Sequence, residues 1–136
     1  MKSLQLLFML MLLLVSFSCL SGEPIVIGET IRIDSKVLMK KASINIRLPS
    51  SYQALEHKRY PVFYNLGSDT DFAATAGTIE LLSHNQGYPM PEAILVSLTT
   101  ETAVSIIDRG VKSKDFINFL ETDVIPYIDK HYRSQP

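Results

Sequence analysis

Two apolar stretches with a helical pattern between them constrain the fold of this chain more than any other feature. Val62–Leu66 and Ala93–Leu98 are almost continuously apolar, as strands in parallel sheets are when both of their faces are covered. Between them, Ala73–Asn85 carries apolar residues at helical spacing. The order strand, helix, strand predicts a βαβ unit with a right-handed crossover, and therefore an α/β fold.

Strands of another kind precede this unit, and a helix follows it. Ile25–Ile27 and Ile31–Ile33 are short β-rich stretches, and Ile44–Leu48 alternates apolar with polar residues, which is typical of a strand with one buried face. Downstream, Ser113–Arg133 has the apolar stripe of an amphipathic helix, which Pro126 should kink or divide. We therefore expect antiparallel edge strands, then the βαβ unit, then a further helix.

The first 22 residues have the layout of a secretory signal peptide. Lys2 gives a short positive segment, Leu6–Val15 an unbroken apolar run, and Ser16–Cys19 a zone of small residues for cleavage. The apolar run is well short of the ~20 residues that span a bilayer, so a signal peptide is favoured over a membrane anchor. We expect an exported protein, periplasmic or extracellular, with residues 23–136 as one partial domain.

Cys19, the only cysteine in the chain, is a candidate for lipid attachment because small residues precede it. Ser16 stands where bacterial lipoprotein signals usually carry leucine, which argues against that role. Ordinary cleavage before Cys19, or after Ser21 or Gly22, fits the same residues. Two alternatives stay open: a membrane-anchored lipoprotein, and a protein that meets the membrane only through its signal peptide.

The charge pattern and the histidines exclude several kinds of function. The chain has 13 Lys and Arg against 14 Asp and Glu; they are scattered, so nucleic-acid binding has no electrostatic support. His57, His84 and His131 stand alone, without metal-ligand spacing. Gly67 lacks the glycine motif of a phosphate-binding loop. We expect neither a metal nor a cofactor.

Four segments together resemble a family of α/β-hydrolases. They are Arg47–Pro49 with Tyr52, Tyr60–Tyr64, Phe119-Leu120, and Ile125–Arg133. In their order and spacing, the chain from Ile27 onward is similar to the esterase family that includes esterase D-like and enterochelin esterase-like enzymes. The resemblance implies the N-terminal half of an α/β-hydrolase sheet, and a serine-type hydrolase that acts on a small-molecule ester.

The residues that do the chemistry in that family are missing from this sequence. In the family, the helix equivalent to Ser113–Arg133 leads into a strand and a G-x-S-x-G turn, and the acid and histidine follow later. No G-x-S-x-G occurs here, so we assign no catalytic residue. We expect a truncated carboxylic-ester hydrolase that is inactive as given. The alternative is a non-catalytic secreted or lipid-anchored binding module.

Part of an oxyanion hole could still lie in the chain. The family's loop after the strand equivalent to Val62–Leu66 usually reads Leu-Asp-Gly, and a main-chain N–H there stabilises the tetrahedral intermediate. Here the loop is Leu66-Gly67-Ser68-Asp69, which makes the N–H groups of Ser68 and Asp69 the candidates. Losing such a donor costs ~3 kcal/mol of barrier. The alternative is a polar loop that only caps the next helix.

The same resemblance implies an unpaired strand. Sheets of this family place the strand equivalent to Val62–Leu66 next to the strand that carries the nucleophile. Without that neighbour, an apolar strand edge is open to pairing with another chain. We therefore expect self-association through this edge.

Overall fold

The computed structural model describes residues 22–108 and 113–135. The predicted signal peptide up to Ser21, with Cys19, lies outside these residues, so export and lipid attachment stay predictions. Within the described ranges, no helix combines the length and the apolarity that a membrane span needs.

A four-stranded mixed sheet forms the centre of the molecule, in the order β1-β2-β4-β3. Its strands are β1 (Glu29–Ser35), β2 (Lys40–Arg47), β3 (Val62–Asn65) and β4 (Ile94–Leu98). β2 runs antiparallel to both β1 and β4, whereas β3 pairs with β4 in parallel. The predicted α/β fold is confirmed, with antiparallel strands on one side of the sheet and the βαβ unit on the other.

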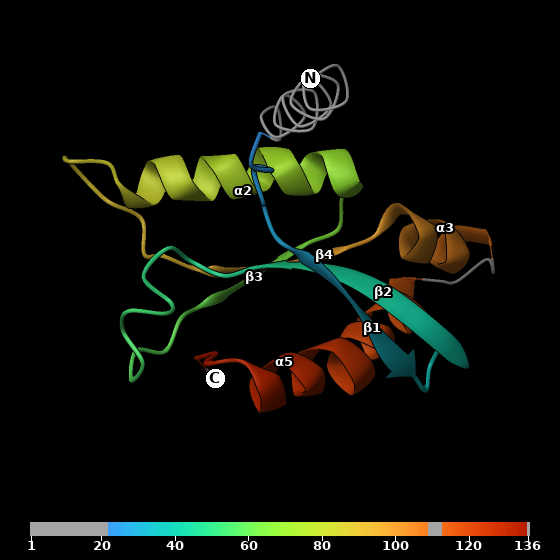
Figure 1. Cartoon of the computed structure of the whole chain (residues 1–136). Helices are drawn as coiled ribbons and strands as arrows, with labels where there is room; N and C mark the ends of the chain where they lie inside the picture. Colours follow the sequence, from blue (N-terminus) through green and yellow to red (C-terminus); the bar gives the residue numbers. More distant parts are fainter. Residues whose placement is uncertain (1–21, 109–112, 136) are drawn as a thin grey trace, which may run out of the picture.

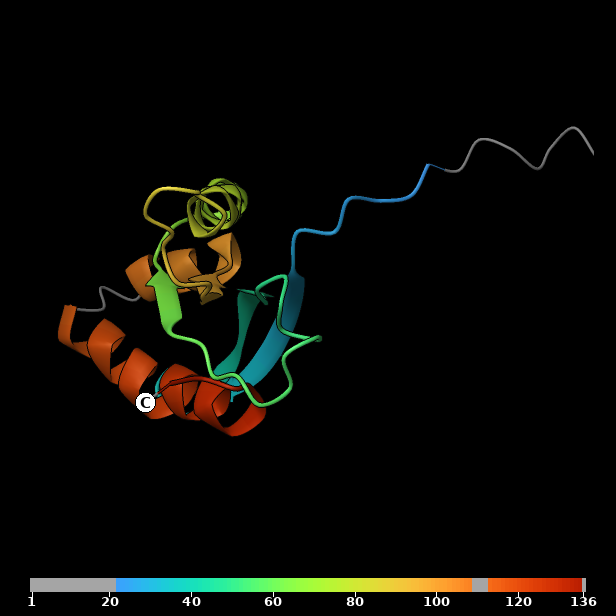
Figure 2. The ribbon, with the colours of Figure 1, turned by 90° about the vertical axis from the view of Figure 1, so that its left-hand side faces the viewer.

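Helices cover both faces of the sheet. They are α2 (Asp69–Ser83), α3 (Thr100–Asp108), α4 (Ser113–Phe119), the π-helix η1 (Leu120–Val124) and α5 (Ile125–His131). α2 lies over one face, and the row α4, η1 and α5 lies over the other (Figures 1 and 2). α3 follows β4 directly and lies near the carboxyl end of that strand.

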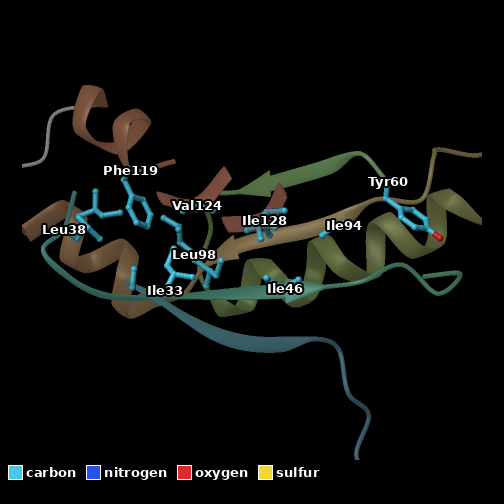
Figure 3. Packing of buried hydrophobic residues seen from close by; sticks show 13 residues of the cluster. Ile33, Leu38, Ile46, Tyr60, Ile94, Leu98, Phe119, Val124 and Ile128 are labelled. Atoms are coloured by element: carbon cyan, nitrogen blue, oxygen red, sulfur yellow. The ribbon is translucent and has the colours of Figure 1, made fainter. Parts of the chain in front are cut away.

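The larger part of the core lies between the sheet and the row of helices α4, η1 and α5. Ile46 and Ile94 of the sheet pack there with Phe119, Val124 and Ile128, each at most 1% exposed (Figure 3). A smaller cluster packs α2 on the opposite face; its members are Phe72, Ala76, Ile79, Ala93 and Leu95. Both faces of β4 are therefore buried, as its continuous apolar sequence predicts.

Two polar residues of β2, Asn45 and Arg47, lie on the face that α2 covers. Asn45 is 7% exposed and donates from Nδ2 to Asp69 Oδ1 at 2.6 Å. Arg47 donates to the Ala76 carbonyl at 3.2 Å and pairs with Glu80 at 2.6 Å. The alternation of β2 thus separates an apolar face from a hydrogen-bonded one, where the sequence predicted a buried and a solvated face.

Pro126 divides the last helix, as predicted, and the break takes the form of the π-helix η1. The Ile125 N–H bonds to the carbonyl of Leu120, five residues earlier, and Pro126 lies at the start of α5. Proline has no N–H, and its ring crowds the carbonyl four residues before it. A wider turn removes that conflict while the helices on either side continue.

Several element boundaries differ from the sequence prediction. Ile25–Ile27 forms no strand, and Ile25 is 94% exposed because β1 begins only at Glu29. The helix predicted from Ala73 begins at Asp69, because Ser68 caps it.

Candidate functional site

The candidate site lies at the carboxyl ends of the parallel strands β3 and β4. The loop Leu66–Ser68 follows β3, and Thr99 follows β4. In open α/β sheets, ligands bind outside the carboxyl ends of the strands. The predicted oxyanion residues are therefore at the edge of the sheet where a reaction site is expected.

Ser68 forms a capping box with Asp71 at the start of α2. Its N–H donates to Asp71 Oδ2 at 2.7 Å, its hydroxyl donates to the same oxygen at 2.8 Å, and the Asp71 N–H points back at Ser68 Oγ. These bonds, first that from the Ser68 N–H and then that from its hydroxyl, lower the pKa of Asp71. The loop does cap the helix, and the Ser68 N–H is engaged by a carboxylate.

Asp69 links the loop to two neighbouring elements. Its carboxylate accepts from Asn45 Nδ2 at 2.6 Å and from the Thr100 hydroxyl at 3.0 Å. Its own N–H lies 3.4 Å from Thr100 Oγ1, at the long limit of a hydrogen bond. Of the two oxyanion candidates, Asp69 therefore has the N–H that is less firmly engaged, and its role as a donor stays a prediction.

Gly67 is required by the close approach of the helix behind it. A Cβ at this position would lie 2.3 Å from Asp71 Cβ, a separation that side chains do not reach. The capping box holds Asp71 in that place. The sequence Leu66-Gly67-Ser68 thus goes with a loop that folds back on α2.

An apolar cavity of about 220 Å³ opens beside the same loop. Its lining residues come from β3's end, β4, α3 and α4: Leu66, Leu98, Ala103, Ile106 and Phe116. Leu66 is 57% exposed at its rim, whereas Leu98 and Ile106 belong to the core. The sequence did not predict this cavity, since α3 has no sequence signal that separates its cavity-facing residues from core residues.

β3 is the edge strand of the described sheet, as predicted. The prediction that both of its faces are covered was wrong, since Phe63 is 49% exposed. The segment after α5 lies alongside the residue that leads into it. Ser134 forms a parallel bridge with Tyr60, with the Tyr60 N–H bonded to the Arg133 carbonyl and the Gln135 N–H to the Tyr60 carbonyl, both at 2.8 Å. Figure 2 shows this C-terminal segment beside the chain that enters β3.

Two of the three histidines, His84 and His131, contact carbonyls of their own helices, and His57 lies exposed in the loop before β3. His84 Nδ1 contacts the Glu80 carbonyl at 2.9 Å, and His131 Nδ1 the Tyr127 carbonyl at 2.8 Å. Across residues 22–108 and 113–135, no three metal-ligating side chains come together. The site as described therefore offers backbone donors, the carboxylates of Asp69 and Asp71, and an apolar cavity.

Comparison with solved structures finds the same fold in part of two known hydrolases. The chain superposes on an IroE-like serine hydrolase from Shewanella oneidensis with a TM-score of 0.63 and 21% identity, covering 79% of this chain and 39% of that one. An enterobactin esterase from Shigella flexneri, crystallised with 2,3-dihydroxy-N-benzoyl-serine, matches with a TM-score of 0.54 and 15% identity over 84% of this chain and 28% of that one.

These similarities show the fold only, and they cover only part of each neighbour's chain. The chain spans less than two fifths of either neighbour. No protein-family model matches the chain, and no curated protein matches it.

Proposed function

We propose that this chain is the N-terminal part of a serine-type carboxylic-ester hydrolase that is exported through residues 1–22. The observation that carries the proposal is the parallel bridge between Tyr60 and Ser134. It sets the chain after α5 beside the entrance to β3, in the direction of β3. The fold of the neighbouring serine hydrolases supports the same reading.

The direction of the bridge tells where a continuing strand would lead. A parallel strand advances in step with its neighbour. From Ser134 opposite Tyr60, it would pass Val62–Asn65 and reach the level of Gly67 after about seven residues. In the resembling family, the nucleophile lies on the turn after this strand. A serine there would face the loop that carries Ser68 and Asp69.

The loop with Ser68 and Asp69 would then position the ester and polarise its carbonyl group. The Asp69 N–H could turn from its long contact with Thr100 toward a developing oxyanion, whereas the Ser68 N–H would first have to leave Asp71. Such preorganised donors stabilise the transition state of acyl transfer. Without a nucleophile among these residues, the chain by itself is inactive on its small-molecule ester.

One observation favours the alternative, a non-catalytic secreted or lipid-anchored binding module. The Asp71 carboxylate takes up the Ser68 N–H, and the Asp69 carboxylate lies close by. Two negative charges beside the loop oppose a developing oxyanion.

The two functions are separated by two experiments. The purified chain should neither react with a fluorophosphonate probe nor hydrolyse p-nitrophenyl acetate; a labelled Ser68 would show that the nucleophile lies in this chain after all. The gene, read past the codon for Pro136 in any frame, should encode an apolar strand and G-x-S-x-G. A reading without them supports the binding module.

A further inference from the structure

We propose that the turn between β1 and β2 contacts an anionic membrane surface, with Met39 as the side chain that enters the lipid. The turn consists of residues 36–39, between the end of β1 at Ser35 and the start of β2 at Lys40. Figure 1 shows it at the outer end of the two strands, where the arrow of β1 ends. The inference is independent of the proposed hydrolase function, because the turn shares no residue with the β3–α2 loop.

Met39 has a backbone conformation that glycine adopts more easily. Its φ is 53°, in the left-handed region that residues with a Cβ seldom occupy. Such residues persist where the surrounding structure holds them, and they gather at functional sites. The Met39 side chain is 84% exposed, so packing within the described chain does not explain a methionine at this position. A contact outside the chain explains it.

The rest of the turn is held from below by a buried carboxylate. Asp123 accepts hydrogen bonds from the Ser35 hydroxyl at 2.6 Å and from the N–H groups of the next two residues, both at 3.1 Å. Leu38 is 2% exposed and belongs to the core (Figure 3). Met39 therefore extends from an ordered base, so that inserting it into another phase orders little more of the chain.

Positive charge flanks the exposed methionine. The outer part of the hairpin, residues 32–41, has one acidic residue, Asp34, which pairs with Lys41 at the surface. Its basic residues are Arg32, Lys36, Lys40 and Lys41. With both acids of the adjacent η1 included, Glu121 and Asp123, four positive charges still stand against three negative ones, in a chain whose net charge is −1.

An exposed apolar side chain between lysines fits an anionic lipid surface. Lysines near such a surface are attracted by its negative potential, and an apolar residue beside them enters the boundary between headgroups and acyl chains. A soluble polyanion would attract the same lysines but offers no apolar phase to Met39. We therefore assign the turn to a membrane that contains acidic lipids.

A fluorescent reporter tests the insertion in the full chain. The sequence has no tryptophan, so Met39→Trp places a single one at the turn. Tyr88→Trp is the matched control, because Tyr88 is 96% exposed in the loop after α2. Residues 1–21 are the same in both variants and so cannot cause a difference between them.

The vesicles have brominated acyl chains, which quench a tryptophan that enters them. With phosphatidylglycerol, we expect the emission of Met39→Trp to be quenched and that of Tyr88→Trp to be unchanged. With neutral phosphatidylcholine, neither should be quenched. Quenching at both positions, at neither, or equally in both lipids would overturn the proposal.

The charges are tested in the Met39→Trp background. Lys36→Gln and Lys40→Gln should each weaken the titration with phosphatidylglycerol about five-fold. Lys130→Gln, on the exposed surface of α5, should leave it unchanged. Equal losses from all three would indicate an attraction of the whole chain and would overturn the site at the turn.

Met39→Gly separates the contact from the stability of the turn. It should unfold at no lower urea concentration than the parent chain, because glycine adopts a φ of 53° without strain. A smaller fraction of it should float with phosphatidylglycerol vesicles in a density gradient, in which aggregated protein stays below. A Met39→Gly variant that floats as the parent does would overturn the role of Met39, and would point to a soluble polyanion as the partner of the lysines.

Discussion

Glu92 should stabilise the fold in a way that acid removes. It lies just before β4 and joins two other segments at the amino end of that strand. Its carboxylate accepts from the Ser51 hydroxyl at 2.5 Å and the Ser51 N–H at 3.2 Å, and it pairs with Lys58 Nζ at 2.7 Å. Replacing it by glutamine keeps its size and removes its charge.

The contribution of Glu92 to the free energy of unfolding follows from the pKa of its carboxyl group. Burial alone would raise it, but the hydrogen bonds from Lys58 and Ser51 outweigh burial and hold the pKa of Glu92 at about 2, against an ordinary 4.5. At ~1.36 kcal/mol per unit, the upper limit is about 3 kcal/mol. Since the Lys58 side chain is 42% exposed, solvent screening reduces the expected contribution to about 1–2 kcal/mol.

The sign of the pH dependence is fixed by the direction of the shift. Because the folded-state pKa is the lower one, the contribution is complete above the unfolded-state value near 4.5. It is lost as the pH falls from there to about 2. The Glu92→Gln variant should therefore differ from the parent protein at pH 7 and approach it at pH 2.5.

Urea unfolding of the parent protein and of Glu92→Gln, followed by circular dichroism at pH 7 and pH 2.5, measures this difference in stability. Asp34→Asn is the control, because the Asp34–Lys41 pair is exposed on both sides and should contribute nothing measurable at either pH. A Glu92→Gln variant as stable as the control variant at pH 7 would refute the reasoning. A loss that persists undiminished at pH 2.5 would refute it as well.

Three further predictions follow. Asp123→Ala should cost about 2–4 kcal/mol of unfolding free energy, because a buried acceptor for one hydroxyl and two N–H groups is lost; the exposed neighbour Glu121→Ala should cost little, and equal losses would contradict the assignment. Gly67→Ala should speed amide exchange in the first turn of α2, because its Cβ displaces Asp71; an unchanged exchange pattern would show that the loop has room. The mature protein should lack its first residues by mass spectrometry, and an intact Met1 would sink the export hypothesis.

The sequence predicted the layers of the fold because they depend on local patterns. Continuous apolar runs identified β3 and β4, and Pro126 identified the break in the last helix. The start of α2 was also readable, since Ser68 and Asp71 have the spacing of a capping box. The predicted start at Ala73 was instead based on the spacing of apolar residues, which begins only after the first turn of α2.

What the sequence did not reveal depends on contacts between distant segments. Asp123 lies in an amphipathic helix, and its charge would place it on the solvated face. Yet it is 8% exposed. Its carboxylate accepts a hydrogen bond from the hydroxyl of Ser35, at the end of β1 and 88 positions earlier in the chain. The apolar cavity likewise forms from four elements, and each lining residue alone resembles a core residue. Neither feature has a periodicity of its own.

The central claim, that β3 is prepared to receive a parallel strand, is tested most directly by amide exchange across Tyr60–Leu66. The N–H and carbonyl of Tyr60 both point toward Arg133–Gln135, and direction alternates along a strand. The N–H groups of Val62 and Tyr64 therefore point to the open edge, and those of Phe63 and Asn65 point to β4.

In the isolated chain at low protein concentration, Val62 and Tyr64 should exchange much faster than Phe63 and Asn65. Light scattering should show self-association as the concentration rises. In a product that continues past Pro136 into the expected strand, all four amides should be protected. A compact monomer of the present chain with all four amides protected would contradict the account, because its sheet would then be closed without a fifth strand.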